Sequence, residues 1–232
     1  MPLTETQIDR YSRQIVLPAV GGRGQEALLG CAVAIVGTGQ LARLTALYLA
    51  GAGIGRLDVL GLVDDAGIDW FREEIPDLNP DVTVEARLFP RSTAQSAVWG
   101  APYHLLLDTT GEPAALDRLN AAALAHRLPL VAGGVNGSQG WLAVFHGDER
   151  AAPCVRCAES ALRAVADRRG DTPLTPSVTG VIASLQALEV IKLRLAIGTD
   201  AAGRWLQYDA EALTMTELPL SKLPDCPACA RG

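Results

Sequence analysis

Four of the five cysteines form two C-x-x-C pairs that lie far apart in the chain. They are Cys154 with Cys157 and Cys226 with Cys229. Four thiolates at this spacing form the tetrahedral ligand set that zinc prefers, and they leave no coordination position for water. The alternative, two redox pairs, lacks a thioredoxin-like sequence around either pair. The sequence therefore predicts a structural zinc ion that attaches the C-terminal tail to the segment around residue 154.

The remaining cysteine and the three histidines offer no second catalytic centre. Cys31 lies inside an apolar, strand-like run, where a small buried side chain is expected rather than a nucleophile. His104, His126 and His146 have no acidic or thiol residue directly beside them in the sequence. We expect surface or structural roles for all three.

A glycine-rich turn is the second chemical signal, and it follows the apolar run 32–36. Gly37 suits a tight strand-to-helix turn, Gly39 lets the backbone approach a phosphate, and the small Ala42 permits close helix packing. Gln40 lies in the same turn and is a candidate nucleotide contact with them. Small residues at such a turn also serve plain packing, so the turn alone leaves both interpretations open.

The elements that must position these groups alternate between strands and helices. Strands are expected at 31–36, 57–60, 82–88, 105–108 and 130–135, and helices at 40–50, 65–78, 91–100 and 113–127. Such alternation predicts a Rossmann-like, doubly wound and mostly parallel α/β sheet. A further strand at 141–145 alternates in polarity and is expected at the edge of the sheet.

The two ends of the chain complete one domain, 1–232. Residues 1–30 are expected to form N-terminal helices, at 4–14 behind a capping box and at 25–29. Residues 31–150 form the nucleotide-binding core. Residues 151–232 form a zinc-stapled lobe that wraps on the sheet. Within this lobe, helices are expected at 159–168 and 178–197, and strands at 204–209 and 214–218.

The composition restricts the classes of function. The chain has 26 acidic and 20 basic residues, a net charge of −6. This balance disfavours nucleic acid as the main partner, because binding a phosphate backbone needs a basic face. The first residues lack a signal-peptide pattern, and no apolar run reaches membrane-spanning length. We therefore expect a cytoplasmic protein with no membrane partner, in which thiols stay reduced.

Several motifs together resemble one family. They are the R-Y-S-R-Q sequence at 10–14, the glycine turn, Asp-Thr-Thr at 108–110, the segments 180–189 and 208–210, and both cysteine pairs. In this order they resemble the ThiF/MoeB/HesA family of ubiquitin-activating-like adenylyltransferases. The resemblance implies that MgATP adenylates the C-terminal carboxylate of a ubiquitin-fold or sulfur-carrier protein. It also implies a homodimer in which Arg13 reaches the nucleotide of the neighbouring subunit.

The same resemblance identifies charged positions that this chain lacks. Where the family ends its second strand with a ribose-binding aspartate, this chain has Gly61, and Asp64 or Asp65 could replace it only after a shift of the strand. The segment between Gly61 and Asn79 is too short for the family's phosphate-binding arginine segment. Counting back from Asn79 places Gly67 where the family has a lysine.

The magnesium site and the turn also depart from the family pattern. Gly111 stands where the family has its magnesium aspartate, and Glu112 follows one residue later. Gln40 replaces a glycine that gives the phosphates room in the family. Three lost charges, each worth about 2 to 4 kcal/mol in a preorganised site, would lower the rate by many decades.

The sequence supports two hypotheses and disfavours a third. The favoured one is a degenerate member, a pseudoenzyme that serves as scaffold for a carrier protein, as a homodimer or with a family paralogue. The second is an active adenylyltransferase with a rearranged ATP and magnesium site. It would use Arg13 across the dimer, Asp108 and Glu112 for the metal, and Asp64 or Asp65 for the ribose. A nicotinamide or flavin oxidoreductase is disfavoured, because no acid closes the second strand.

Overall fold

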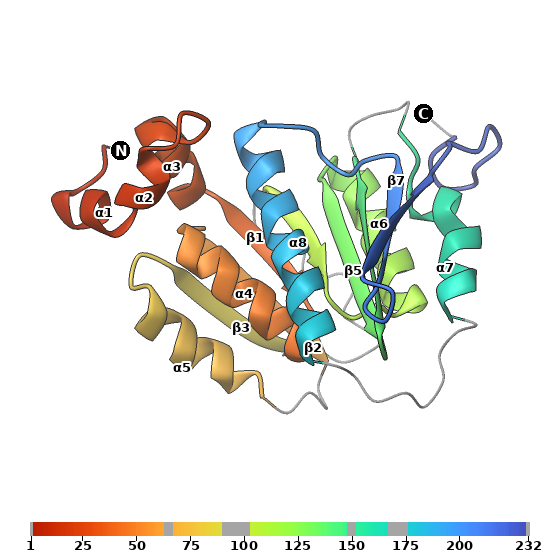
Figure 1. The fold of residues 1–232 in the computed structure, drawn as a ribbon, viewed down its shortest axis with the longest axis horizontal. Helices are drawn as coiled ribbons and strands as arrows, with labels where there is room; N and C mark the ends of the chain where they lie inside the picture. Colours follow the sequence, from red (N-terminus) through yellow and green to blue (C-terminus); the bar gives the residue numbers. More distant parts are fainter. Residues whose placement is uncertain (1, 63–66, 90–102, 148–151, 167–175, 231–232) are drawn as a thin grey trace.

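The computed structural model describes residues 2–62, 67–89, 103–147, 152–166 and 176–230 (Figure 1). Its centre is one sheet of eight strands in the order β3-β2-β1-β4-β5-β6-β7-β8. The strands are β1 Ala32–Val36, β2 Arg56–Leu62, β3 Thr83–Phe89, β4 Leu105–Asp108, β5 Leu130–Asn136, β6 Gln139–Phe145, β7 Arg204–Asp209 and β8 Thr214–Pro219. The first five strands in this order pair in parallel, and β6, β7 and β8 continue the sheet antiparallel. The predicted mostly parallel sheet is confirmed.

The helices cover both faces of this sheet. They are α1 Glu5–Arg10, α2 Ser12–Ile15, α3 Gly21–Leu29, α4 Gln40–Ala52, α5 Asp69–Leu78, α6 Pro113–His126, α7 Glu159–Ala166 and α8 Pro176–Leu195, with a 3-10 turn η1 at Val155–Ala158. Along β1, Val33 and Ile35 belong to the core beneath α4, α5 and α8, whereas Ala34 belongs to the core beneath α6. The apolar run therefore lacks alternation because each of its faces packs against helices. None of the described helices is long and apolar enough to span a membrane.

The prediction of an edge strand at 141–145 is wrong. The observed strand β6 pairs with β5 on one side and with β7 on the other, and every residue from Gly140 to Phe145 is buried. The segment after residue 200 is not a lobe laid on the sheet, because β7 and β8 extend the same sheet. This pairing provides the hydrogen bonds that the backbone of β6 would otherwise lack. The edge strand on this side of the sheet is β8, all of whose residues are exposed.

Several helix boundaries also differ from expectation. The first predicted helix is divided at Tyr11 into α1 and α2, and α3 begins at Gly21, four residues before the predicted start. Helix α5 begins at Asp69 because residues 67 and 68 form a turn. The helix expected at 91–100 lies outside the described residues.

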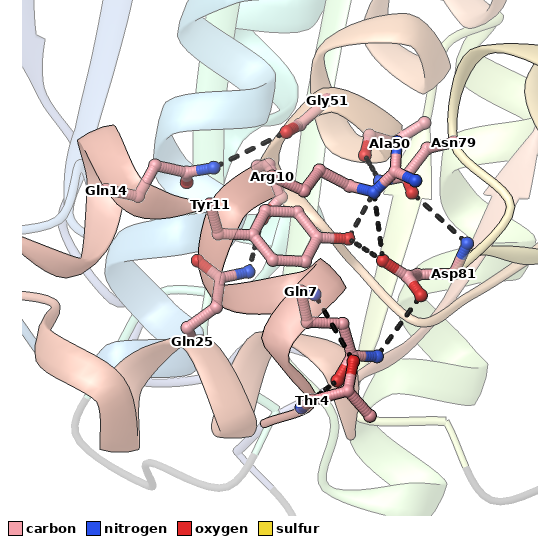
Figure 2. Close-up of polar contacts among 11 residues, drawn as sticks. Thr4, Gln7, Arg10, Tyr11, Gln14, Gln25, Ala50, Gly51, Asn79 and Asp81 are labelled. Atoms are coloured by element: carbon pink, nitrogen blue, oxygen red, sulfur yellow. Dashed lines mark hydrogen bonds and ion pairs between the residues drawn. The ribbon is translucent and has the colours of Figure 1, made fainter. Parts of the chain in front are cut away.

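The N-terminal helices are attached to the sheet by a polar network around Asn79 (Figure 2). The buried Asn79 amide donates to the Ala50 carbonyl at 2.6 Å and to the Tyr11 hydroxyl at 2.9 Å. The Tyr11 hydroxyl in turn donates to Asp81 at 3.0 Å, and Arg10 forms an ion pair with the same carboxylate at 3.2 Å. Burial raises the pKa of Tyr11 to about 12, so the hydroxyl keeps its proton at neutral pH. Three residues of the R-Y-S-R-Q motif, Arg10, Tyr11 and Gln14, are therefore anchors (Figure 2).

Replacement of Asn79 tests this anchor. Asn79→Ala removes the donor to the Tyr11 hydroxyl and one donor to the Ala50 carbonyl, which keeps the Gly53 amide at 2.9 Å. We expect the loss of these two hydrogen bonds to lower the free energy of unfolding by about 1 to 3 kcal/mol. Gln14→Ala is the matched control, because its bond to the Gly51 carbonyl is exposed and 3.4 Å long. Urea unfolding of both variants measures the difference. Equal losses would contradict a central role for Asn79.

Candidate functional site

The glycine turn lies where the order of the parallel strands reverses. Strand β1 pairs with β2 on one side and with β4 on the other, and Val36 is opposite Asp108. The Gly37 amide donates to the Leu60 carbonyl at 3.0 Å. A β-carbon on Gly37 would lie 2.5 Å from the Thr109 hydroxyl, so no larger residue fits there. Crevices at such a reversal are the usual ligand sites of open α/β sheets.

Gly39 and its neighbours form the start of α4. Gly39 is the N-cap, no side chain caps the helix, and a β-carbon at this position would meet no atom within 4 Å. The backbone amides of the first turn therefore have no side-chain cap, and they lie at the positive end of the helix dipole. Gln40 is exposed, so its side chain is not packed into the space beside Gly39. Ala42 is fully buried and serves packing.

Asp108 ends β4 beside the turn and is fully buried. Its Oδ1 accepts from the Thr110 amide at 3.1 Å and from the Thr110 hydroxyl at 2.7 Å. Its Oδ2 is buried without a hydrogen-bond partner among the described residues. Burial raises the pKa of Asp108 to about 6, although these hydrogen bonds favour the charged form. The carboxyl group is thus enclosed by the protein, and its burial disfavours the charged form.

The other acids proposed for the nucleotide and metal are placed differently. Glu112 is exposed at the N-cap of α6, and its charge contributes to the raised pKa of Asp108. The carboxylates of Asp108 and Glu112 therefore interact electrostatically, as two ligands of one metal site would. Asp64 and Asp65 lie outside the described residues. Strand β2 ends at Leu62, one residue beyond Gly61.

Two glycines occupy positions where the family resemblance implies a charged side chain. Gly111 has φ +62°, and a β-carbon on it would lie 3.2 Å from the Cα atom of Gly134. Gly67 has φ +101°, and a β-carbon on it would lie 2.1 Å from Nη2 of Arg43. Both backbones are left-handed, a conformation that disfavours any side chain. The local structure is therefore built for glycine at both positions.

Arg43 is a site residue that sequence reasoning missed. It lies in the first turns of α4, and its guanidinium is 5.3 Å from the centroid of the Trp70 ring. Its Nε atom is buried without a hydrogen-bond partner in the described part of the chain. The only sequence signal was one basic residue inside an otherwise mostly apolar helix, which by itself does not indicate what the side chain contacts.

Arg13, predicted to act across a dimer, lies on α2 away from the anchor network that its neighbours form. It is exposed, and no ion pair or hydrogen bond of its side chain is seen within residues 2–62 or the other described ranges. This placement leaves Arg13 available to a second molecule.

The four paired cysteines come together although the two pairs are far apart in the chain. Their Sγ atoms all lie within 4.8 Å of one another, with separations of 3.6 Å for Cys157 and Cys229 and 3.7 Å for Cys154 and Cys226. Zinc–sulfur bonds of about 2.3 Å in a tetrahedron imply sulfur separations of about 3.8 Å. The Leu223 amide also donates to Cys157 Sγ at 3.4 Å. The cluster can hold one metal ion, as the sequence predicted.

The remaining thiol and imidazoles have structural surroundings. Cys31 is buried, and burial raises its pKa to about 11, so it is not an activated nucleophile. His104 Nδ1 accepts from the Ala32 amide at 3.1 Å. His146 Nε2 lies 3.0 Å from Asp200 Oδ2, a pairing between residues distant in sequence, and His126 is exposed.

A pH-dependent stability measurement tests the buried carboxyl of Asp108. Its pKa is about 6 in the native state and about 3.8 when unfolded, so the native state binds the proton more tightly. The group therefore opposes folding increasingly as the pH rises from about 4 to about 6, and fully above that range. The stability of Asp108→Asn relative to the natural protein should rise by on the order of 2 kcal/mol between pH 4 and pH 8.

Urea unfolding of both proteins at the two pH values measures this change. Glu74→Gln, which removes an exposed acid from α5, is the control and should show a much smaller change. A stability difference for Asp108→Asn that does not vary with pH would show that folding does not raise the pKa of this carboxyl.

Comparisons with known proteins agree with this geometry. The sequence model of the ThiF family matches residues 11–71 and 68–228. Molybdopterin-synthase adenylyltransferase of Escherichia coli is 31% identical over 252 residues, covering 99% of this chain and 99% of that protein. Sulfur carrier protein adenylyltransferase of Thermus thermophilus is 33% identical over 258 residues, covering 99% and 93%.

Among solved structures, E. coli MccB with ATP has a TM-score of 0.79 and 16% identity, covering 95% of this chain and 74% of that one. This likeness shows a shared fold. Because the family model and the two sequence relatives span almost the entire chain, this protein belongs to the ThiF family.

Proposed function

We propose that this protein binds the C-terminal tail of a sulfur-carrier or ubiquitin-fold protein and has little or no adenylation activity of its own. The relatives at 31% and 33% identity are named adenylyltransferases of molybdopterin synthase and of a sulfur carrier protein. Both match 99% of this chain, which supports a related partner. The proposal of weak chemistry is carried by one observation, the left-handed glycines at positions 67 and 111.

The strongest support for weak adenylation chemistry comes from Gly111. The resemblance places a magnesium-binding aspartate here, yet the backbone has φ +62° and Gly134 lies against the space for a side chain. An aspartate would therefore require the backbone to change, rather than only a different side chain. Glu112 is exposed and follows one residue later, and Asp108 is fully buried at the end of β4, so neither places a carboxylate at position 111 itself.

The shortened segment after β2 supports the same proposal. The two segments matched by the family model meet at residues 68–71, within the stretch between Gly61 and Asn79 that lacks the family's arginine segment. Arg72, the basic residue inside this stretch, pairs with Asp69 and donates to the Ala86 carbonyl. It is therefore committed to the packing of α5.

The proposed assembly is a dimer, either of two copies or with a family paralogue. Arg13 is exposed and makes no contact of its own within the described residues, so a partner's nucleotide site is where it would act. A paralogue with a complete site would make Arg13 useful even where this chain performs no chemistry.

The second candidate is an active adenylyltransferase with a rearranged site. It is favoured by the electrostatic coupling of Asp108 and Glu112, two acids at one edge of the sheet. The unpartnered Oδ2 of Asp108 would then receive its partner from the reacting complex. Here Asp108 and Glu112 would hold magnesium, Asp64 or Asp65 the ribose, and Arg13 the partner's phosphates.

Pyrophosphate exchange separates the two candidates. The protein is incubated with MgATP, labelled pyrophosphate and ubiquitin-fold carriers ending in Gly-Gly, with the E. coli molybdopterin-synthase adenylyltransferase and its carrier as positive control. We expect carrier binding by calorimetry, lost when the two terminal glycines are removed, and exchange many decades below the control. Robust exchange would establish the second candidate. Absence of binding to every carrier would overturn the proposed partner class.

We also propose that the metal held by the four cysteines is zinc and that its role is structural. Support comes from the sulfur separations of 3.6 to 4.0 Å and from the four thiolates, which leave no open position. The ion would attach the segment after β8 to η1. We propose a cytoplasmic location, where reduced thiolates persist as metal ligands.

Metal analysis tests this site. We expect about one zinc per chain after purification, and loss of zinc together with a lower melting temperature in Cys154→Ser, because the tail loses its attachment. Cys31→Ala is the matched control, since that cysteine lies outside the cluster and its variant should keep the metal. Folded protein without zinc, or an unchanged melting temperature in Cys154→Ser, would contradict the proposal.

A further inference from the structure

We propose that Arg43 is a phosphate-binding residue of the glycine turn and replaces, from a different helix, the cation absent at Gly67. This inference goes beyond the proposed carrier binding, because it takes the turn to face the phosphates of a nucleotide. It adds a residue role that the sequence positions of the family do not indicate. The ligand class is a nucleoside polyphosphate.

The guanidinium of Arg43 lies beside position 67. Side chains on a helix point back toward its N-terminus, so Arg43 extends from the first turns of α4 toward the end at Gly39. Its Nη2 atom would be 2.1 Å from a β-carbon on Gly67, which means that the guanidinium lies directly against the Gly67 backbone. The positive charge is therefore present beside position 67 even though the residue there is glycine.

The guanidinium of Arg43 has no anionic partner among the described residues. Across the described ranges, no ion pair or hydrogen bond of the Arg43 side chain is found, and its Nε atom is buried without a partner. The Trp70 ring, 5.3 Å away, attracts the cation through its face but accepts no conventional hydrogen bond. By contrast, the guanidinium of Arg72 is paired. A partly buried guanidinium with unused donors fits an anionic ligand.

The surroundings indicate phosphate as that anion. The uncapped start of α4 presents backbone amides and the positive end of the helix dipole, and the space beside Gly39 is open. A helix start binds phosphate oxygens through its amides and an arginine through its guanidinium, so the start of α4 and Arg43 on its first turns together suit a polyphosphate.

Binding measurements on the full chain test the role of Arg43. Isothermal titration calorimetry with MgATP, inorganic tripolyphosphate and adenosine compares the natural protein with Arg43→Met, which keeps an unbranched side chain at this position and removes the charge. We expect about tenfold or greater weakening for ATP and tripolyphosphate, because a charge-assisted contact is lost, and no change for any adenosine binding. Arg43→Lys should retain part of the affinity.

The matched control is Arg23→Met, which removes one exposed arginine from α3, before the start of β1. It should leave the affinities within about twofold. Thermal melting confirms that each variant is folded, and Arg43→Gln replaces Arg43→Met if the latter does not fold.

Three outcomes would overturn the inference. Equal ATP and tripolyphosphate affinities in the natural protein and Arg43→Met would show that the turn binds nucleotide without Arg43. Tighter binding in the variant would show that the guanidinium blocks the site. A natural protein that binds neither polyphosphate would exclude the site, whereas the carrier-binding measurement would still decide the proposed function.

Discussion

The candidate site depends on the hydrogen-bonded pairing of β1 with both β2 and β4. This strand is buried on both faces, and its parallel register with each neighbour fixes where the chain turns into α4. The contacts of Gly37 with Leu60 and Thr109 then leave one path for the backbone between strand and helix. The start of α4, the end of β4 and the end of β2 converge at this edge for that reason.

A buried polar chain connects this edge to the long helix α8. Gln186 donates to the Asp108 carbonyl at 2.7 Å, and its side-chain oxygen lies 3.1 Å from the Thr45 hydroxyl on α4. These groups are hydrogen-bonded inside the protein, so α4, α8 and β4 hold one relative position. The cysteine cluster instead brings Cys226 and Cys229 of the tail against Cys154 and Cys157 at η1. The candidate metal site and the glycine turn thus lie on different elements of one fold.

The glycine turn has a backbone geometry that suits phosphates, but glycines stand at two positions where the family resemblance implies charged side chains. Backbone features that suit phosphates remain, namely the uncapped helix start and the open space at Gly39. Positions 67 and 111 are left-handed in the backbone and carry no side chain. Arg43 occupies the space beside position 67, so the loss of a charge in the sequence is not the same as its loss in space. A charged group can be supplied by any element that reaches the crevice.

The sequence by itself determined the parallel core, the glycine turn and the two cysteine pairs, because each rests on local spacing. Alternating apolar segments specify strands and helices, and four cysteines in two short motifs suffice for a metal site. Only the tertiary structure decided that β6 is an interior strand, since this depends on the distant strand β7. It also placed the guanidinium of Arg43 against Gly67, a contact between residues of two elements that no spacing along the chain encodes.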